Sequence, residues 1–239
     1  MNLYDETLML LNQYNLRAKK KFGQNFLINK EIIDEIISKS EITKDDVVLE
    51  IGPGLGTLTK ELVKNAKKVI AVELDQDMVD ILNNRFSDSN LEIINDDILK
   101  VDINEITKKY GKIKVVANLP YYITTPIIMK LLENRYEIKS ITVMVQKEVG
   151  ERLCGNSGNK EYGAITISVE YYSDAHIIID VPKDNFLPSP EVDSVVIKLD
   201  LLDKPRVEVK NEKKFFNLVK AGFSQRRKTI NNSLSSRGI

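Results

Sequence analysis

Continuous apolar runs alternate with segments of helical spacing through the middle of this chain, and this alternation constrains the fold most. The runs lie at 47–51, 68–73, 91–94, 114–117 and 140–146. Strands that are apolar on both faces are typical of parallel sheets covered by helices on each side. Helices are expected between these runs at 58–66, 77–86 and 127–132, and after the last of them at 147–153. The alternation therefore predicts a doubly wound α/β sheet with five parallel strands.

The two ends of the chain follow other patterns. Helices are expected at 5–15 and at 30–39. Late strands at 175–181 and 194–200 are joined by a proline-rich loop that is too short for a crossover helix, so an antiparallel hairpin is predicted. One basic helix is predicted from Phe215 to Leu234. We therefore expect one large domain at 1–202 and, at 203–239, the partial beginning of a basic helical domain.

Composition excludes several classes of protein. Asp5 and Glu6 precede the first apolar residues, so no signal peptide is expected. No apolar run approaches the roughly 20 residues of a membrane span. The single cysteine, Cys154, rules out an internal disulfide framework and a cysteine-based zinc site. We expect a cytoplasmic protein that contacts no membrane and holds no metal and, because no apolar interface stripe is evident, a monomer.

Charge is unevenly distributed, although basic and acidic residues number 35 each. Residues 17–30 carry a net charge of +5 and residues 204–228 a net charge of +7, which leaves the body between them acidic. Either segment alone could be a solvated face. The two together favour a polyanionic partner that the ends of the chain contact, and they indicate a nucleic acid.

A glycine-rich turn, Gly52-Pro53-Gly54-Leu55-Gly56, directly follows the first predicted strand. Glycines there permit a tight turn and let the backbone approach a ligand closely. The dinucleotide-binding fingerprint requires a glycine at position 57, where this chain has Thr57. The spacing therefore favours S-adenosylmethionine, a nucleoside that carries an amino acid, over a dinucleotide, with Gly52 and Gly54 against it.

Acidic residues follow the next two strands. Glu73 ends the second strand, about 20 residues past the turn, where a carboxylate can accept hydrogen bonds from both ribose hydroxyls. After the third strand, Asp96 or Asp97 can accept from the adenine amino group, and Asp97 is preferred. Ile98 can pack on the adenine ring, and Leu74 is expected beside the same cofactor.

The segment Asn118-Leu119-Pro120-Tyr121 ends the fourth strand, at the edge where open parallel sheets bind ligands. An exocyclic adenine amine is a poor nucleophile because its lone pair is delocalised into the ring. Two acceptors aimed at its hydrogens, the Asn118 side-chain carbonyl and a backbone carbonyl of Leu119 or Pro120, would favour the pyramidal nitrogen. Tyr121 would stack on the base. Catalysis is expected through orientation and electrostatics, without a catalytic histidine.

Several segments together resemble the small-subunit ribosomal RNA adenine dimethyltransferases, the bacterial KsgA or RsmA family. They occur in the order found in that family and span roughly residues 17–234. The matching segments are 21–27 (KFGQNFL), 50–59 (EIGPGLGTLT), 118–123 (NLPYYI), 146–149 (QKEV), 186–194 (FLPSPEVDS) and 223–228 (FSQRRK).

This resemblance implies a Rossmann-like class I methyltransferase fold. It implies dimethylation at N6 of two adjacent adenosines near the 3′ end of 16S rRNA, in the small ribosomal subunit, with S-adenosylmethionine as the methyl donor. By position, Asn25 and Leu27 would close over the cofactor, and Asn118 would stand at the methyl-transfer point. Phe186 would face Tyr121 across the target base. The expected RNA contacts of the basic C-terminal segment are Arg226, Arg227 and Lys228.

Three other functions stay open on the sequence. Enzymes of antibiotic resistance that methylate an adenine of 23S rRNA share the fold and cofactor, but they usually have isoleucine where this chain has Leu119. A nicotinamide oxidoreductase would use the same sheet. A ribosome-assembly factor with little catalysis would use the same basic segments.

Overall fold

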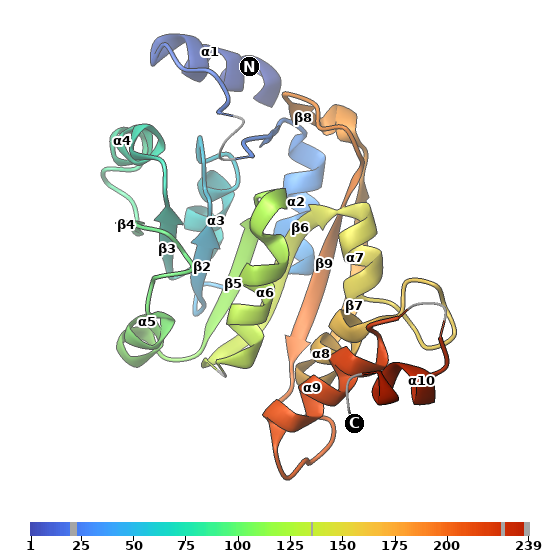
Figure 1. The fold of residues 1–239 in the computed structure, drawn as a ribbon. Coiled ribbons are helices and arrows are strands. Elements are labelled where there is room, and N and C mark those ends of the chain that lie inside the picture. Colours follow the sequence, from blue (N-terminus) through green and yellow to red (C-terminus); the bar gives the residue numbers. More distant parts are fainter. Residues whose placement is uncertain (20–22, 135, 226–227, 237–239) are drawn as a thin grey trace.

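A mixed sheet forms the centre of the molecule in the computed structural model, which describes residues 1–19, 23–134, 136–225 and 228–236 (Figure 1). Across the sheet lie β4 (Leu91–Asn95), β3 (Lys68–Glu73), β2 (Val47–Ile51), β5 (Ile113–Asn118), β6 (Ile138–Gln146), β9 (Ser194–Leu201) and β7 (Ser173–Val181). The first five are parallel, and β9 is antiparallel to both β6 and β7. The predicted doubly wound sheet and the antiparallel pairing of the late strands are confirmed.

Helices cover both faces of this sheet. On one face, α2 (Lys30–Lys39) and α3 (Thr59–Asn65) pack against strand residues such as Val48. On the other face, Leu49 and its equivalents meet α5 (Ile103–Tyr110), α6 (Thr124–Glu133), α7 (Lys147–Leu153) and α8 (Ala164–Tyr172). Neighbouring strand residues point to opposite faces, so both faces of the strands are buried, as their continuous apolar runs predicted.

The N-terminal region covers the carboxyl edge of the parallel strands. There α1 (Leu3–Gln13) packs on α4 (Gln76–Arg85) and on the glycine-rich turn, with Leu10 and Leu55 in one buried cluster. Glu6 of α1 forms an ion pair of 2.6 Å with Arg85. Nearby, β1 (Phe26–Leu27) pairs antiparallel with β8 (Phe186–Leu187) from the loop between the late strands. Two distant segments therefore lie over the edge that was predicted to bind ligands.

Two helices, α5 and α8, lie where the sequence analysis predicted none. The prediction of one helix from Phe215 to Leu234 was wrong, because α9 (Glu212–Gly222) ends before α10 (Ile230–Ser235) begins. The hydroxyl of Ser224 donates to the carbonyl of Ala221 just past the end of α9. The side chain of Thr229 then caps the start of α10 by accepting from the backbone N–H of Asn232. Local capping therefore divides this segment into two helices.

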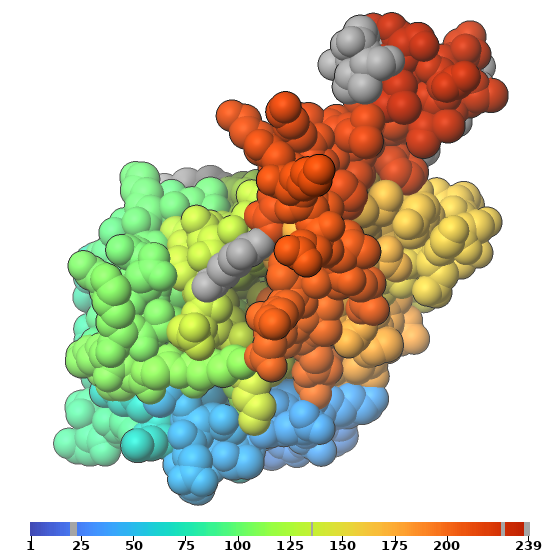
Figure 2. All heavy atoms as spheres, turned by 90° about the horizontal axis from the view of Figure 1, so that it is seen from below, coloured from blue at the N-terminus to red at the C-terminus, as the bar shows by residue number. Residues whose placement is uncertain are grey.

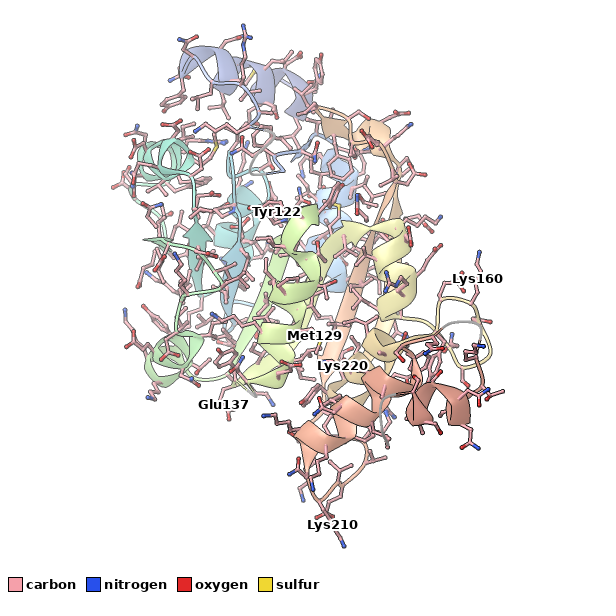
Figure 3. All side chains as sticks on the ribbon, in the orientation of Figure 1. Tyr122, Met129, Glu137, Lys160, Lys210 and Lys220 are labelled. Atoms are coloured by element: carbon pink, nitrogen blue, oxygen red, sulfur yellow. The ribbon has the colours of Figure 1, made fainter. Side chains whose placement is uncertain are left out.

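The chain after β9 lies at the end of the sheet opposite the carboxyl edge of the parallel strands. Figure 2 shows it crossing this lower end and projecting beyond the body, and Figure 3 places Lys210 and Lys220 there. Rings of Tyr171 and Tyr172 in α8 pack on Phe215 and Phe216 of α9, which attaches the segment to the body. The boundary at residue 202 stays a prediction. None of the helices within the described ranges has the length and apolar character required to cross a membrane.

Candidate active site

Two adjoining hollows open at the carboxyl edge of the parallel strands and share Gly52, Glu73 and Pro120 in their linings. The Asn118 hollow is also lined by Asn25, Leu27, Glu50, Gly54, Leu119 and Tyr121. The Asp97 hollow is also lined by Leu74, Asp96, Ile98, Tyr122, Ile123 and Ile127. The structure thus brings together every predicted cofactor contact and the whole predicted methyl-transfer segment.

The glycine-rich turn forms the floor between β2 and α3. Gly52 and Gly54 adopt φ values of +65° and +56°, a region that side chains other than glycine rarely occupy. A Cβ on Gly54 would stand 3.2 Å from the ring of Phe26 in β1. The turn therefore needs glycine for its backbone conformation and for the close approach of the segment that covers it.

The carboxylate of Glu73 is fixed by backbone N–H groups at the end of β3. One oxygen accepts from Gly54 at 3.1 Å and the other from Asp75 at 2.8 Å. Burial raises the pKa of Glu73, while these two hydrogen bonds oppose the shift. A carboxylate has about four acceptor sites, and the backbone N–H groups of Gly54, Asp75 and Leu74 do not fill all of them, so the fixed carboxylate can still accept from a hydroxyl.

Glu50 is a second buried carboxyl group in the wall of the Asn118 hollow. It is 1% exposed, and within the described chain its Oε2 atom has no hydrogen-bond partner. Burial raises the pKa of Glu50 to about 8; the Thr59 hydroxyl opposes the shift, and the nearby Glu73 carboxylate adds to it. A buried polar atom without a partner is costly, so this oxygen is available to a polar ligand or to water.

The loop after β4 brings both Asp96 and Asp97 to the lining of the Asp97 hollow, and the two differ in burial. Asp97 is partly buried and its carboxylate accepts from the backbone of Leu99 at 2.9 Å, whereas Asp96 is exposed. Ile98 is buried beside it. The ammonium group of Lys130 in α6 donates to the carbonyls of Ile98 and Val101 at 2.8 and 2.6 Å. These contacts hold the loop against α6, and the choice of Asp97 over Asp96 as the adenine ligand stays a prediction.

Asn118 is oriented by a contact from the N-terminal region. Its side-chain Nδ2 donates to the backbone carbonyl of Asn25 at 3.0 Å. Because a carbonyl can only accept, the nitrogen of the amide must face Asn25, and the side-chain oxygen stays available as an acceptor. The carbonyl of Pro120 already accepts from Ile123 at 3.2 Å and from the hydroxyl of Thr124 at 3.1 Å. Of the two backbone carbonyls considered, that of Leu119 is therefore favoured.

The ring of Tyr121 is held by the first residue of β9. Its hydroxyl lies 2.7 Å from the hydroxyl of Ser194, which is fully buried. Burial raises the pKa of Tyr121, so the phenol stays protonated at neutral pH. The ring is thereby oriented at the wall of the Asn118 hollow.

The segment before β1 is fastened to the loop after β3. Gln24 donates to the Asp75 carboxylate at 2.9 Å, and Lys19 forms ion pairs with Asp75 at 2.7 Å and Asp77 at 2.6 Å. The side chain of Asn25 donates to the carbonyl of Gly23 at 3.3 Å. Asn25 and its neighbours are therefore held beside Glu73.

Some predicted substrate contacts lie away from the two hollows. Phe186 is 3% exposed and pairs with Leu27 between β8 and β1, and it is in neither lining. Lys228 is exposed in the segment at the opposite end of the molecule. Arg226 and Arg227 lie outside the described residues, as does the 20–22 part of the N-terminal motif. Their roles in RNA binding stay predictions.

Sequence reasoning missed three residues that belong to this site: Glu50, Tyr122 and Ser194. Glu50 offered a signal, because it is a charged residue inside an otherwise apolar strand. Tyr122 directly follows the predicted segment and was given no role. Ser194 offered none, because only the antiparallel placement of β9 beside β6 brings it to Tyr121.

The groups around the two hollows suit S-adenosylmethionine. A fixed carboxylate can bind a ribose diol, an aspartate beside a buried isoleucine can bind adenine, and an unpartnered carboxyl oxygen can bind a polar amino-acid group. The glycine turn leaves room for close approach of the backbone. Among the residues that the structure describes, no group of three or more His, Cys, Asp and Glu side chains could hold a metal ion.

Comparison with known proteins gives the family. Residues 15–239 match the family Ribosomal RNA adenine dimethylase. Ribosomal RNA small subunit methyltransferase A of Lachnoclostridium phytofermentans is 53% identical over 236 residues, which cover 97% of this chain and 81% of the relative. The protein of the same name from Clostridium acetobutylicum is 48% identical over 229 residues, 95% of this chain and 83% of the relative.

Two solved structures also resemble this chain. The crystal structure of a dimethyladenosine transferase from Plasmodium falciparum has a TM-score of 0.75 at 34% identity, covering 86% of this chain and 73% of that one. The 23S rRNA methyltransferase ErmE has a TM-score of 0.75 at 27% identity, covering 89% of this chain and 84% of that one. With most of its length matched to one family model and to relatives near 50% identity, the chain belongs to the ribosomal RNA adenine dimethylase family.

Proposed function

We propose that this protein transfers methyl groups from S-adenosylmethionine to N6 of two adjacent adenosines near the 3′ end of 16S rRNA, giving N6,N6-dimethyladenosine. One observation carries the proposal. The oriented amide of Asn118 lines a hollow that adjoins the Asp97 hollow and shares Glu73 with it. A methyl donor and an amine acceptor can therefore meet there. The proposal includes action in the cytoplasm, as a monomer, on the small ribosomal subunit.

The residues that would hold the donor are those of the turn and of the next two strand ends. S-adenosylmethionine, when bound, supplies an electrophilic methyl group on a sulfonium. Glu73 accepts from the ribose hydroxyls, Asp97 accepts from the adenine amino group, and Ile98 and Leu74 supply the apolar contacts. Gly52 and Gly54 let the backbone approach the amino-acid part, with Asn25 and Leu27 covering it.

The acceptor adenine would be held by the segment after β5. In the first transfer, the side-chain oxygen of Asn118 and the carbonyl of Leu119 accept from the two amine hydrogens and orient the nitrogen lone pair toward the methyl group. The acidic proton that the nitrogen loses on methylation passes to solvent. In the second transfer, one of the two acceptors holds the hydrogen that remains. Tyr121, fixed by Ser194, packs on the base. This is catalysis by position and by preorganised dipoles. His176, the sole histidine, lies on β7 and lines neither hollow, so a histidine base has no place in the scheme.

The relative similarities favour small-subunit RNA over the large subunit as the substrate. The two small-subunit enzymes are 53% and 48% identical to this chain, whereas the 23S enzyme ErmE is 27% identical. Thr57, at the position where a dinucleotide fold needs glycine, argues against a nicotinamide oxidoreductase. An adenine in an RNA loop can leave its stack to enter such a site at modest cost.

Methyl incorporation from labelled S-adenosylmethionine tests the proposal. Unmethylated small subunits should gain two dimethyladenosines, and large-subunit RNA should gain none. Asn118→Ala should lower the rate about 100-fold, the order expected for a preorganised polar group, while S-adenosylhomocysteine still binds. The matched control is Asn134→Ala at the exposed far end of α6. Incorporation into large-subunit RNA alone, or an undiminished rate for Asn118→Ala, would refute it.

A further inference from the structure

Tyr121 and Tyr122 follow one another in a short 3-10 turn (Tyr121–Ile123), yet their side chains serve different hollows. Tyr121 lines the Asn118 hollow and is fixed by Ser194. Tyr122 lines the Asp97 hollow and is 55% exposed. Figure 3 shows Tyr122 beside α6, at the end of the sheet away from Lys210 and Lys220. The two rings are thus distributed between the proposed acceptor and donor sites.

The surroundings of Tyr122 suit a flat heterocycle. Leu74, which is 47% exposed, and Tyr122 present apolar surface at the rim of the hollow, and Ile98 is buried within it. The carboxylates of Asp97 and Glu73 line the same hollow. The exposed Tyr122 ring and the exposed Leu74 side chain thus lie beside two hydrogen-bond acceptors. A ligand that binds this patch should have both apolar faces and hydrogen-bond donors, as adenine has.

The ring is also confined from its other side. A Cβ on Gly23 would lie 3.4 Å from the Tyr122 ring, so the segment before β1 approaches the tyrosine closely. In the described part of the chain, the Tyr122 hydroxyl takes part in no hydrogen bond. Burial, with Asp97 and Glu73 adding to its effect, raises the pKa of Tyr122, so the hydroxyl stays a neutral donor. The side chain therefore has a defined position and an unused polar end.

We propose that Tyr122 is the aromatic wall of the donor-adenosine pocket and contacts the adenine of the cofactor. The segment Asn118 to Tyr122 then holds both adenines of the reaction on adjacent side chains, the target adenine through Tyr121 and the donor adenine through Tyr122. This inference rests on the proposed function, since it assigns a residue to the donor side of that site.

Two ligands and three variants test it. S-adenosylhomocysteine is the form of the donor that remains after methyl transfer, with its adenosine and its amino-acid part. The second ligand, 5′-methylthioadenosine, keeps the adenosine and lacks the amino-acid part. Tyr122→Ala should weaken the binding of both ligands by at least about fivefold, the lower limit for loss of one base–aromatic contact. Tyr122→Phe, which keeps the ring, should bind within about threefold of the unaltered protein. Tyr4→Ala removes a comparably exposed tyrosine from α1 and is the control, with no expected change.

A direct readout does not depend on the stability of the alanine variant. The chain contains no tryptophan, so Tyr122→Trp introduces a single indole whose fluorescence should change on addition of 5′-methylthioadenosine. Tyr4→Trp should stay silent. Equal affinities for Tyr122→Ala and the unaltered protein, a loss confined to S-adenosylhomocysteine, or an unresponsive Tyr122→Trp would overturn the assignment. If the unaltered protein binds neither ligand, the proposed function itself fails.

Discussion

At the scale of single residues, the site is built from side chains that backbone atoms hold in place. Glu73 is fixed by the N–H groups of Gly54 and Asp75, and Asn118 is fixed by the carbonyl of Asn25. The partners of both groups are backbone atoms of the protein itself, so the fold sets their orientation. Glu50 differs, because one of its oxygens lacks a partner in the described chain. The free-energy cost of burying the Glu50 carboxyl group should therefore be measurable.

Replacing Glu50 by Gln should change how stability depends on pH. The unfolded chain releases the Glu50 proton near the ordinary value of 4.5, but the folded chain keeps it until about pH 8. The free energy of unfolding contributed by this group is therefore full below pH 4.5 and falls as pH rises toward 8. Glutamine has no proton to lose. Between about pH 4.5 and pH 8, the free energy of unfolding of the unaltered protein should therefore fall relative to that of Glu50→Gln, by up to about 1.4 kcal/mol per pH unit.

Urea unfolding at pH 5, 6, 7 and 8 measures this difference. Glu73 also has a raised pKa, and because its charge interacts with Glu50, the comparison measures the pH dependence of Glu50 together with that coupling. Glu61→Gln, at a partly buried carboxyl group of α3 that pairs with the exposed Lys64, is the control and should give a smaller difference. A difference for Glu50→Gln that stays constant from pH 5 to 8 would show that the Glu50 carboxyl group is ionised in the folded protein.

At the scale of elements, periodicity predicted the strands well because they are buried on both faces. Each of the five parallel strands was located to within about two residues of its observed ends. The helix α8 was missed because its residues, such as Val169, Tyr171 and Tyr172, favour strands by propensity, and burial against the sheet decides its structure. The helix α5 was predictable, since Asp102 caps it and Ile103 and Ile106 have helical spacing.

Some residues of the candidate site were predictable from the sequence, and others were not. Residues at strand ends, among them Glu73, Asp97 and Asn118, were predictable because parallel strands bring their carboxyl ends to one edge. Contacts made by segments that are distant in the sequence were not predictable. The Ser194 contact requires the pairing of β9 with β6, and the buried position of Phe186 results from the pairing of β8 with β1. No local pattern in the sequence encodes either pairing.

Gly150 in α7 shows how closely one helix approaches the sheet. A Cβ at this position would lie 2.2 Å from Cγ2 of Val195 in β9, so the helix or the strand would have to move. Gly150→Ala should lower the free energy of unfolding by about 1–3 kcal/mol, the cost of overpacking a core. Gly222→Ala at the end of α9 is the control, because its Cβ would meet Ile230 at an ordinary 3.7 Å. Equal urea-unfolding midpoints for the two variants would contradict this packing.

At the scale of the whole molecule, the two hollows and the basic C-terminal segment lie at opposite ends of the sheet (Figure 1). The α9 lysines point into solvent, and Figure 3 places Lys220 and Lys210 far from Tyr122. A ribosomal RNA is large enough to contact both ends at once. If the basic segment contacts RNA as proposed, changing its charge should alter RNA affinity without altering the affinity for the methyl donor.

Removing three exposed lysines of α9 tests this division. Changing Lys213, Lys214 and Lys220 to Gln should weaken binding of 16S rRNA, because each phosphate contact releases counterions when it forms. The slope of log affinity against log salt should become shallower by about two, while the affinity for S-adenosylhomocysteine stays unchanged. The control changes Lys67, Lys100 and Lys108, which are exposed on the acidic body, and should leave the slope nearly as it was. If both triple variants alter the slope equally, RNA contacts the surface without regard to the basic segment, and the asymmetry of charge has no role in recognition.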